Sequence, residues 1–187
     1  MDYAAVAPMM SHLWSPIVAV SSAWRGTHNA QIAVAVGGAS IVPQRPRVIV
    51  QIYKRNYSYE LVRASGAFAL NFLGSGQLEL MHTLGFASGR GRRKLEGSPY
   101  RLGSTGSPIL EGCWGYLDCR VVNQMDGGDM ACFLGEVVDG ATVGEPQPLW
   151  WQEARTRMPE SWRREWDAKM QLEVAFSVEH MDDIPGS

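Results

Sequence analysis

The 187-residue sequence has little cysteine, no long apolar run and almost no net charge, and each shortage excludes a class of protein. Three cysteines (Cys113, Cys119 and Cys132) are too few for the disulfide framework of a small secreted domain. No stretch approaches the roughly 18 apolar residues of a transmembrane helix. No Lys or Arg precedes an apolar run at the N-terminus, which argues against a secretory signal. We therefore expect one cytoplasmic domain over residues 1–187, without a membrane partner.

Several catalytic and binding motifs are missing as well. The sequence has no Gly-x-x-x-x-Gly-Lys phosphate loop, no Gly-x-Gly-x-x-Gly after a strand and no Gly-x-Ser-x-Gly elbow. The four histidines (His12, His28, His82 and His180) have no His or Cys at metal-ligand spacing, so we expect no metal site. No helix-turn-helix, zinc-finger or aromatic RNA-binding pattern is present, so we expect no nucleic-acid partner.

Charge is distributed unevenly although the formal net charge is only −2. From Arg45 to Arg101, ten Lys or Arg accompany three Glu, a balance of +7. The rest of the chain has seven basic and sixteen acidic residues, a balance of −9. A basic middle inside an acidic protein predicts an anion site of limited size.

Apolar, β-branched runs separated by turn residues predict antiparallel strands. We expect them at residues 17–23, 30–36, 47–54, 67–73, 114–122 and 130–139, with a seventh at 174–178. Asp126-Gly127-Gly128-Asp129 is typical of a hairpin turn. Cys113 and Cys119, six apart in one expected strand, should share a buried face. This pattern predicts a mainly β fold, a small closed or nearly closed barrel with a few short helices.

Two short helices are expected. The first begins near Ser58 as N-cap, has Glu60 in its first turn and stops at Gly66. The second covers residues 75–84 and ends at Gly85.

Residues 144–170 form a Trp-rich excursion that holds four of the seven tryptophans. Trp162 and Trp166 are four apart and would share one face of a helix that begins after Pro159. We favour the interpretation that they dock this segment onto the barrel or across a dimer, since aromatic residues often serve packing and interfaces. The alternative is a lid that brings an aromatic ring over a planar ligand.

Three loops are candidates for ligand binding. Gly26–Ala30 leads into a strand of small residues whose backbone a flat ligand could approach, although tight barrel packing explains it equally well. Lys54–Ser58 combines two cations and a hydroxyl with a helix N-terminus, and an ordinary capped loop is the alternative. Ser88–Lys94 has four cations in five residues, a pattern more often solvated than functional.

Seven short blocks between about residues 17 and 139 resemble a known family in the same order. They are Gly26-Thr27-His28-Asn29-Ala30, Ser40-Ile41-Val42-Pro43 with the strand over 48–52, Asn56-Tyr57-Ser58-Tyr59-Glu60-Leu61, Gly66-Ala67-Phe68-Ala69-Leu70-Asn71-Phe72-Leu73, Ser88-Gly89-Arg90 with Lys94, Gly106-Ser107-Pro108-Ile109-Leu110-Glu111, and Phe133-Leu134-Gly135-Glu136-Val137-Val138. The sequence resembles the flavin reductase-like family with the FMN-binding split barrel, which includes the flavoredoxins.

This resemblance implies an antiparallel split β-barrel of Greek-key type and a homodimer with one FMN per subunit near the partner chain. Ser58 takes the place of a Thr whose hydroxyl meets the FMN phosphate, and Arg90 and Lys94 match basic positions that face it. The basic middle of the chain agrees, because FMN carries a dianionic phosphate. Together, these matches and the candidate loops give the expected cofactor-binding residues Asn29, Ala30, Gln31, Ser40, Lys54, Asn56, Ser58, Ser88, Arg90 and Lys94.

The implied function is an FMN-binding oxidoreductase in which a nicotinamide, NADH or NADPH, donates hydride to the flavin without a catalytic side chain. The sequence departs from the family pattern at three places: Gln44-Arg45 separate two prolines, Val34-Ala35 replace Ser-Trp, and Met130 replaces a common His. Two alternatives therefore stay open. One is a non-enzymatic flavoredoxin-type carrier with a protein electron partner, and the other is a split-barrel module for another planar ligand such as haem.

Overall fold

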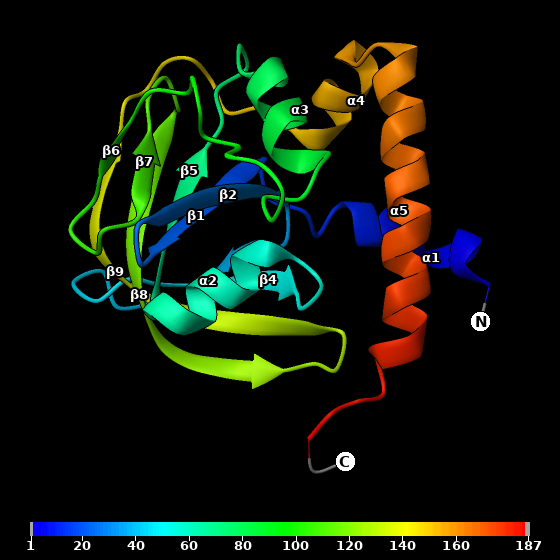
Figure 1. The fold of residues 1–187 in the computed structure, drawn as a ribbon, viewed down its shortest axis with the longest axis horizontal. Coiled ribbons are helices and arrows are strands. Elements are labelled where there is room, and N and C mark those ends of the chain that lie inside the picture. Colours follow the sequence, from blue (N-terminus) through cyan, green and yellow to red (C-terminus); the bar gives the residue numbers. More distant parts are fainter. Residues whose placement is uncertain (1, 186–187) are drawn as a thin grey trace.

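A curled antiparallel sheet of seven strands forms the centre of the computed structural model, which describes residues 2–185 (Figure 1). The strand order across the sheet is β2-β1-β5-β8-β9-β4-β3, and β6 pairs with β7 in a separate ribbon. The strands are β1 (Val18–Trp24), β2 (Thr27–Ala33), β3 (Val36–Gly38), β4 (Arg47–Tyr53), β5 (Ala67–Phe72), β6 (Tyr100–Leu102), β7 (Pro108–Leu110), β8 (Gly115–Asp126) and β9 (Met130–Thr142).

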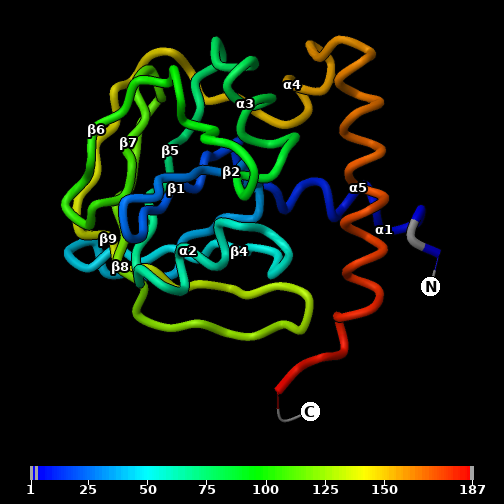
Figure 2. Tube along the Cα trace, in the orientation of Figure 1, coloured from blue at the N-terminus to red at the C-terminus, as the bar shows by residue number. Residues whose placement is uncertain are grey.

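Five helices among the described residues accompany the sheet: α1 (Tyr3–Ser11), α2 (Tyr57–Ser65), α3 (Leu78–Gly85), α4 (Trp151–Arg157) and α5 (Glu160–His180). The backbone trace shows α5 running along one side of the sheet, from α4 toward the β8–β9 hairpin (Figure 2). Among residues 2–185, no helix has the length and apolar character needed to cross a membrane.

Two apolar cores lie on the two faces of the sheet, because side chains alternate along each strand. On β1, Val18 and Val20 enter one core and Ala19 enters the other. The first core is enclosed by the curled sheet and α2, and includes Val50, Phe68, Leu70 and Phe133. The second core lies under α3 and α4, and includes Ile17, Leu73, Met81, Leu149 and Trp151. The first core fixes the barrel, and the second attaches the helices to it.

The prediction of a mainly β, antiparallel protein is confirmed, with several corrections to single elements. The hairpin at Asp126–Asp129 is confirmed, since it joins β8 to β9. The expected strand over 30–36 is wrong in its second half: β2 ends at Ala33, and Val36 starts β3, which pairs with β4 instead. Val34 and Ala35 join the two strands and belong to neither.

The predicted strand over 174–178 is wrong, because these residues lie inside α5. The β-branched and aromatic residues of this segment have strand-like propensity. The side-chain contacts in this part of α5, however, join residues four positions apart, as in a helix. Lys169 pairs with Glu173, and the ring of Phe176 stacks on His180 with centroids 4.1 Å apart. At 21 residues, α5 is also an exception to the expectation of short helices.

Cys113 and Cys119 are buried as predicted but do not share one face of a strand. Cys113 precedes β8 and belongs to the second core, while Cys119 lies within β8 and belongs to the first. Burial raises the pKa of both thiols to about 12, so both are unreactive core residues.

Both predicted helices exist with shifted starts. The first, α2, ends at Gly66 in a left-handed conformation with φ of 67°, as predicted, and Glu60 lies in its first turn. Its N-cap is Asn56 and not Ser58, which lies within the first turn. The second, α3, begins at Leu78, because the backbone N–H of Ser75 instead donates to the carbonyl of Gln147 at 2.7 Å.

The Trp-rich excursion docks onto the helical face of the barrel. The ring of Trp166 lies 4.6 Å from that of Trp151, and Trp162 stacks on His82 of α3 with centroids 4.0 Å apart. Trp162 and Trp166 share a face of α5, which begins directly after Pro159 as predicted. Packing is therefore the role the structure gives these tryptophans, and α5 is the element they position.

Candidate functional site

A cavity of about 300 Å³, here called the inner cavity, lies between β2, the start of α2, the end of α3 with its following loop, and α5. Seven of the ten candidate residues from the sequence line it, although they come from three separate segments of the chain. They are Asn29, Gln31, Asn56, Ser58, Ser88, Arg90 and Lys94.

A buried hydrogen bond forms the floor of the inner cavity. The amide nitrogen Nδ2 of Asn29 donates to the Oγ of Ser58 at 2.9 Å, and the two residues are 3% and 2% exposed. The loop after α3 packs directly on this pair, because a β-carbon at Gly89 would lie 2.8 Å from the Cγ of Asn29. A side chain at position 89 would therefore displace the buried amide of Asn29, and glycine lets the loop approach β2 this closely.

Lys94 supplies a cation in this cavity. It is 5% exposed, and its Nζ donates to the carbonyl of Leu84 at 2.6 Å. Burial, with the neighbouring charges of Arg92 and Lys169, lowers the pKa of Lys94 to about 7. An anion bound beside it would favour the charged ammonium, so Lys94 is suited to respond to a negatively charged ligand.

Two buried acceptor oxygens in the inner cavity have no hydrogen-bond donor among residues 2–185: Oε1 of Gln31 and Oε2 of Glu173. The other carboxylate oxygen of Glu173 lies 3.3 Å from Nζ of Lys169 on the same helix. A buried acceptor without a donor costs about 1–3 kcal/mol, so these oxygens favour a ligand with N–H or O–H groups.

Arg90 and Ser88 shape the rim of the cavity. Arg90 pairs with the carboxylate of Glu60 and donates to the carbonyl of Arg55 at 2.9 Å. The hydroxyl of Ser88 accepts from the backbone N–H of Arg90 at 3.2 Å. Asn56 caps the nine-residue helix α2, whose first backbone N–H groups lack intrahelical partners and favour an anion.

Ala30, Ser40 and Lys54 do not line the inner cavity. Ala30 faces the second core, on the side of β2 opposite to Asn29. Ser40 lies in the exposed β3–β4 loop, where its hydroxyl accepts from the N–H of Val42 at 3.0 Å. Lys54 pairs with Asp126 in the β8–β9 turn at 2.5 Å.

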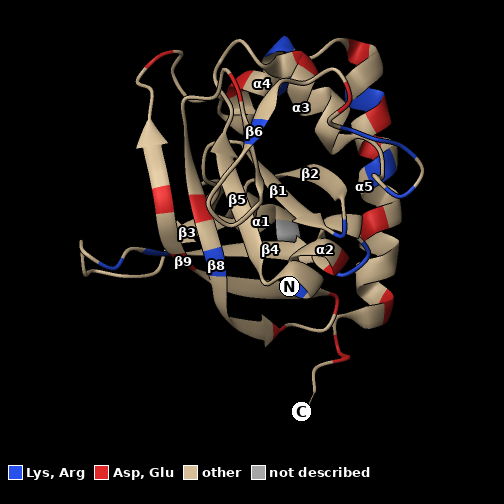
Figure 3. Ribbon diagram, turned by 60° about the vertical axis from the view of Figure 1, so that its left-hand side comes forward, with Lys and Arg blue, Asp and Glu red and all other residues tan. Residues whose placement is uncertain are grey.

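Lining residues from α5 were missed by the sequence analysis: Lys169, Leu172 and Glu173. The four-residue spacing of Lys169 and Glu173 is a helix signal, but it carries no information about where that helix docks. Figure 3 shows Lys and Arg gathered in the loop that follows α3, beside α5.

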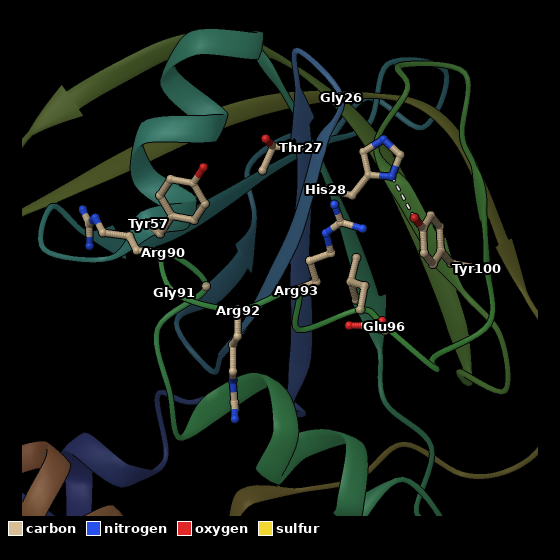
Figure 4. Close-up of a pocket in the computed structure, with 12 residues that line it drawn as sticks. Gly26, Thr27, His28, Tyr57, Arg90, Gly91, Arg92, Arg93, Glu96 and Tyr100 are labelled. Atoms are coloured by element: carbon tan, nitrogen blue, oxygen red, sulfur yellow. Dashed lines mark hydrogen bonds between the residues drawn. The ribbon is translucent and has the colours of Figure 1, made fainter.

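A second cavity of about 630 Å³, here called the arginine cavity, adjoins the inner cavity (Figure 4). The two share Tyr57, Gly89 and Arg90. Its other polar residues come from the start of β2, from the loop between α3 and β6 and from the first residue of β6. They are Thr27, His28, Arg92, Arg93, Glu96 and Tyr100. The candidate loops of the sequence analysis include all of them except Glu96 and Tyr100.

No group of three or more His, Cys, Asp or Glu side chains within residues 2–185 is arranged to hold a metal ion. The polar groups of the two cavities are mainly cations, amides and hydroxyls, with one carboxylate in each, Glu173 and Glu96, and the excess of cations suits a phosphorylated organic ligand.

Comparison with known proteins agrees with this chemistry. Residues 10–159 match the family described as flavin reductase like domain. The chain belongs to this flavin reductase-like family. The family resemblance noted in the sequence is thus confirmed over a longer stretch than the seven blocks covered.

Two curated relatives illustrate the family. The reductase component of a 4-nitrophenol monooxygenase from Rhodococcus opacus is 30% identical over 149 residues, 80% of this chain and 77% of that protein. The high molecular weight rubredoxin of Moorella thermoacetica is 31% identical over 123 residues, 65% of this chain. The match covers only 53% of the rubredoxin, and 59% of the reductase subunit HsaB of Mycobacterium tuberculosis.

Solved structures of the family confirm the split-barrel fold. An FMN-binding protein from Thermus thermophilus, crystallised with p-hydroxybenzaldehyde, superimposes with a TM-score of 0.64 at 29% identity. The similarity covers 69% of this chain and 72% of that one. A flavoredoxin from Methanosarcina acetivorans, 22% identical, has the same fold with a TM-score of 0.65 over 72% of this chain.

Proposed function

We propose that this protein binds FMN in the inner cavity and reduces it with NADH or NADPH. The observation that carries the proposal is the combination of a buried Lys94 ammonium with an unsatisfied acceptor at Gln31, both beside the start of α2. Relatives named for this activity, including an FMN reductase (NADH) from Pseudomonas syringae that is 29% identical, support it.

The residues of the inner cavity fit a flavin in two respects. A dianionic phosphate would be held by Lys94, the hydroxyl of Ser58 and the N-terminal N–H groups of α2. The N–H and hydroxyl groups of a flavin nucleotide are donors that the oxygens of Gln31 and Glu173 lack. We assign the flavin to the seven lining residues and leave Ala30, Ser40 and Lys54 outside the proposed site.

The protein's part in the reaction is binding and orientation. Bound flavin would supply the hydride-accepting chemistry, so no acid, base or nucleophile from the chain is needed. Lys94 would take up a proton at Nζ as the phosphate approaches, because that anion raises its lowered pKa. Asn29 would hold the Ser58 hydroxyl in place through their buried hydrogen bond.

The test compares two lysines that the sequence analysis both names as candidate cofactor-binding residues. Replacing Lys94 with Met should weaken FMN binding about tenfold or more, since a hydrogen bond to a charged group is worth about 1.5–3 kcal/mol. Lys54→Met, outside the cavity, should change it less than about twofold. The measurement is FMN fluorescence titration of both variants, with circular dichroism as the check on folding. Wild-type protein that takes up no FMN would contradict the proposal.

The same preparation separates the two alternatives. A flavoredoxin-type carrier would retain FMN through desalting but oxidise NADH and NADPH slowly in a stopped-flow assay. A module for another planar ligand would take up no FMN. Met130, where the family often has His, starts β9 opposite Tyr53 and lines neither cavity, so its position favours neither alternative.

A homodimer is part of the proposal. It is supported by the resemblance and by exposed apolar side chains on the second half of α5, where Leu172, Val174 and Val178 are more than half exposed. Light scattering should give about twice the chain mass of 20.6 kDa, and a mass of one chain would contradict it.

A cytoplasmic location, based on the cysteine usage of the sequence, belongs to the same proposal.

A further inference from the structure

One wall of the inner cavity comes from α5, a helix outside the part of the chain that matches the family. The match ends at residue 159, and α5 begins at Glu160. From this helix, Lys169, Leu172 and Glu173 line the inner cavity. The family blocks therefore say nothing about what these three residues contribute to ligand binding.

The carboxylate of Glu173 is only half engaged. Its Oε1 lies 3.3 Å from Nζ of Lys169, and its Oε2 is buried without a hydrogen-bond donor among residues 2–185. The preceding residue, Leu172, fixes this turn of α5, because its carbonyl accepts from the guanidinium of Arg55 at 2.8 Å. Arg55 lies two residues before α2, so Glu173 is held near the start of that helix with one oxygen left for a ligand.

The unsatisfied oxygen of Glu173 differs in kind from that of Gln31. An amide carries both a donor and an acceptor, so the side chain of Gln31 can turn over and present either one to the cavity. An ionised carboxylate only accepts hydrogen bonds, whichever way it is turned. Glu173 therefore favours a ligand with an N–H or O–H group at this point of the cavity.

Glu173 is also the one carboxylate among the described lining residues of the inner cavity, where the cations are Arg55, Arg90, Lys94 and Lys169. A negative charge strengthens a hydrogen bond that it accepts but repels a second anion in the same small cavity. Glu173 should therefore act in opposite directions on the two parts of a flavin nucleotide. It attracts the hydroxyl and ring N–H groups and repels the phosphate.

We propose that Glu173 is a specificity-determining residue, which accepts a hydrogen bond from a hydroxyl or ring N–H of the bound flavin and lowers the preference of the site for the phosphorylated form. This inference rests on the proposed function for the presence of the flavin and for its phosphate beside Lys94 and Ser58. Riboflavin has the same ring and hydroxyl groups as FMN but no phosphate. Removal of the carboxylate should therefore make the site select FMN over riboflavin more strongly.

The first measurement compares FMN with riboflavin by fluorescence titration of the wild type and of Glu173→Gln, which keeps the size of the side chain and removes its charge. Riboflavin binding should weaken about fivefold, because a hydrogen bond to a neutral amide oxygen is weaker than one to a carboxylate. FMN binding should change less than about twofold, since the weaker hydrogen bond is offset by the lost repulsion of the phosphate. The ratio of FMN affinity to riboflavin affinity should thus rise about threefold or more.

Inorganic phosphate tests the effect of the charge alone. Isothermal titration calorimetry should show that Glu173→Gln binds phosphate about threefold tighter than the wild type, because the substitution removes a negative charge from the cavity and frees Lys169. The matched control is Glu179→Gln, which removes an exposed carboxylate from the same helix at a position that lines neither cavity. The control should change the affinities for phosphate, FMN and riboflavin by less than about twofold.

Failure of the inference is distinguishable from failure of the proposed function. If the wild type binds FMN and Glu173→Gln leaves the ratio of FMN to riboflavin affinity unchanged, the inference alone is overturned. Equal weakening of FMN, riboflavin and phosphate would also overturn it, since the substitution would then only have displaced α5. Wild-type protein that takes up neither flavin would overturn the proposed function and, with it, the role of Glu173.

Discussion

The two walls of the inner cavity are built in different ways. The barrel wall consists of Asn29 and Ser58, which are buried, hydrogen-bonded to each other and carried by elements packed on the cores. The opposite wall is the second half of α5, a helix in which no residue is buried. The barrel wall is fixed by the fold, whereas the α5 wall depends on contacts of residues that are not buried.

Those contacts are uneven along α5. Its first half is attached by Trp162 and Trp166, which pack on the second core. Its second half is held by Arg55, whose guanidinium donates to the carbonyl of Leu172 at 2.8 Å, and by contact with the β8–β9 turn. A segment with few buried contacts opens at low free-energy cost, so we expect the second half of α5 to be the movable wall of the cavity.

The largest expected difference between the barrel and α5 is in the free energy of unfolding that is lost when a phenylalanine in each region is replaced with Ala. Phe68 is fully buried in the first core, and its ring fills the space above Gly135. Phe68→Ala should lower the free energy of unfolding by about 3–5 kcal/mol. Phe176→Ala, on the half-exposed face of α5, should lower it by less than about 1 kcal/mol. Urea denaturation of both variants measures the difference.

Comparable losses for the two phenylalanines would contradict the comparison, because α5 would then be as tightly integrated as the sheet. Leu70→Ala is a check on the first value. Leu70 lies in the same core as Phe68, and its replacement with Ala should lower the free energy of unfolding by about 2–5 kcal/mol.

The second prediction concerns Lys94, which lies between the two walls. Because its pKa is about 7 when folded and near 10.5 when unfolded, the unfolded chain binds more protons between these values. Stability should therefore rise from pH 7 to about 10, by up to about 1.4 kcal/mol per pH unit, the limit for one proton. This gain in stability is complete above the pKa that Lys94 has in the unfolded chain, and it is lost as the pH falls toward 7.

Lys94→Met should remove this part of the pH dependence in thermal or urea unfolding between pH 7 and 9. Lys169→Met, which removes an α5 charge that helps to lower the pKa of Lys94, should move the rise to higher pH. A pH profile of Lys94→Met that matches the wild type would show that Lys94 keeps its proton in the folded protein at neutral pH.

The barrel could be predicted from the sequence because its signals are local. Along β4, Val48, Val50 and Ile52 alternate with more exposed residues, and Asp126–Asp129 marks the hairpin between the two longest strands. Each signal depends only on residues that are neighbours in the chain, so it can be recognised without knowledge of the tertiary structure.

The site could be predicted only in part. The family blocks identify the segments that carry Asn29, Ser58 and Lys94, but not where each side chain points. Lys54 illustrates the limit, since its ammonium pairs with Asp126 from a distant hairpin. Docking of the start of α5 through Trp162 and Trp166 could be predicted, but the position of its second half beside the inner cavity could not, because that half has no buried residues and no apolar stripe.

The smallest expected effect tests how the end of α5 is held. Gly128 in the β8–β9 turn has φ of 84°, and a β-carbon there would lie 2.7 Å from the carbonyl oxygen of His180. Gly66 has a similar φ of 67°, but a β-carbon there would meet no atom within 4 Å. Replacing either glycine with Ala should therefore cost about 1 kcal/mol of backbone strain, while Gly128→Ala alone should also displace the end of α5.

Amide hydrogen exchange distinguishes the two glycine variants. In Gly128→Ala, amides over residues 172–181 should exchange several-fold faster than in the wild type, and the sheet should remain protected. In Gly66→Ala, exchange in α5 should match the wild type, because Gly66 ends α2 and its open surroundings accept the added methyl group. Equal acceleration of α5 in both variants would mean that its end responds to loss of global stability. Acceleration in Gly128→Ala alone would show that the β8–β9 turn holds this end of the movable wall.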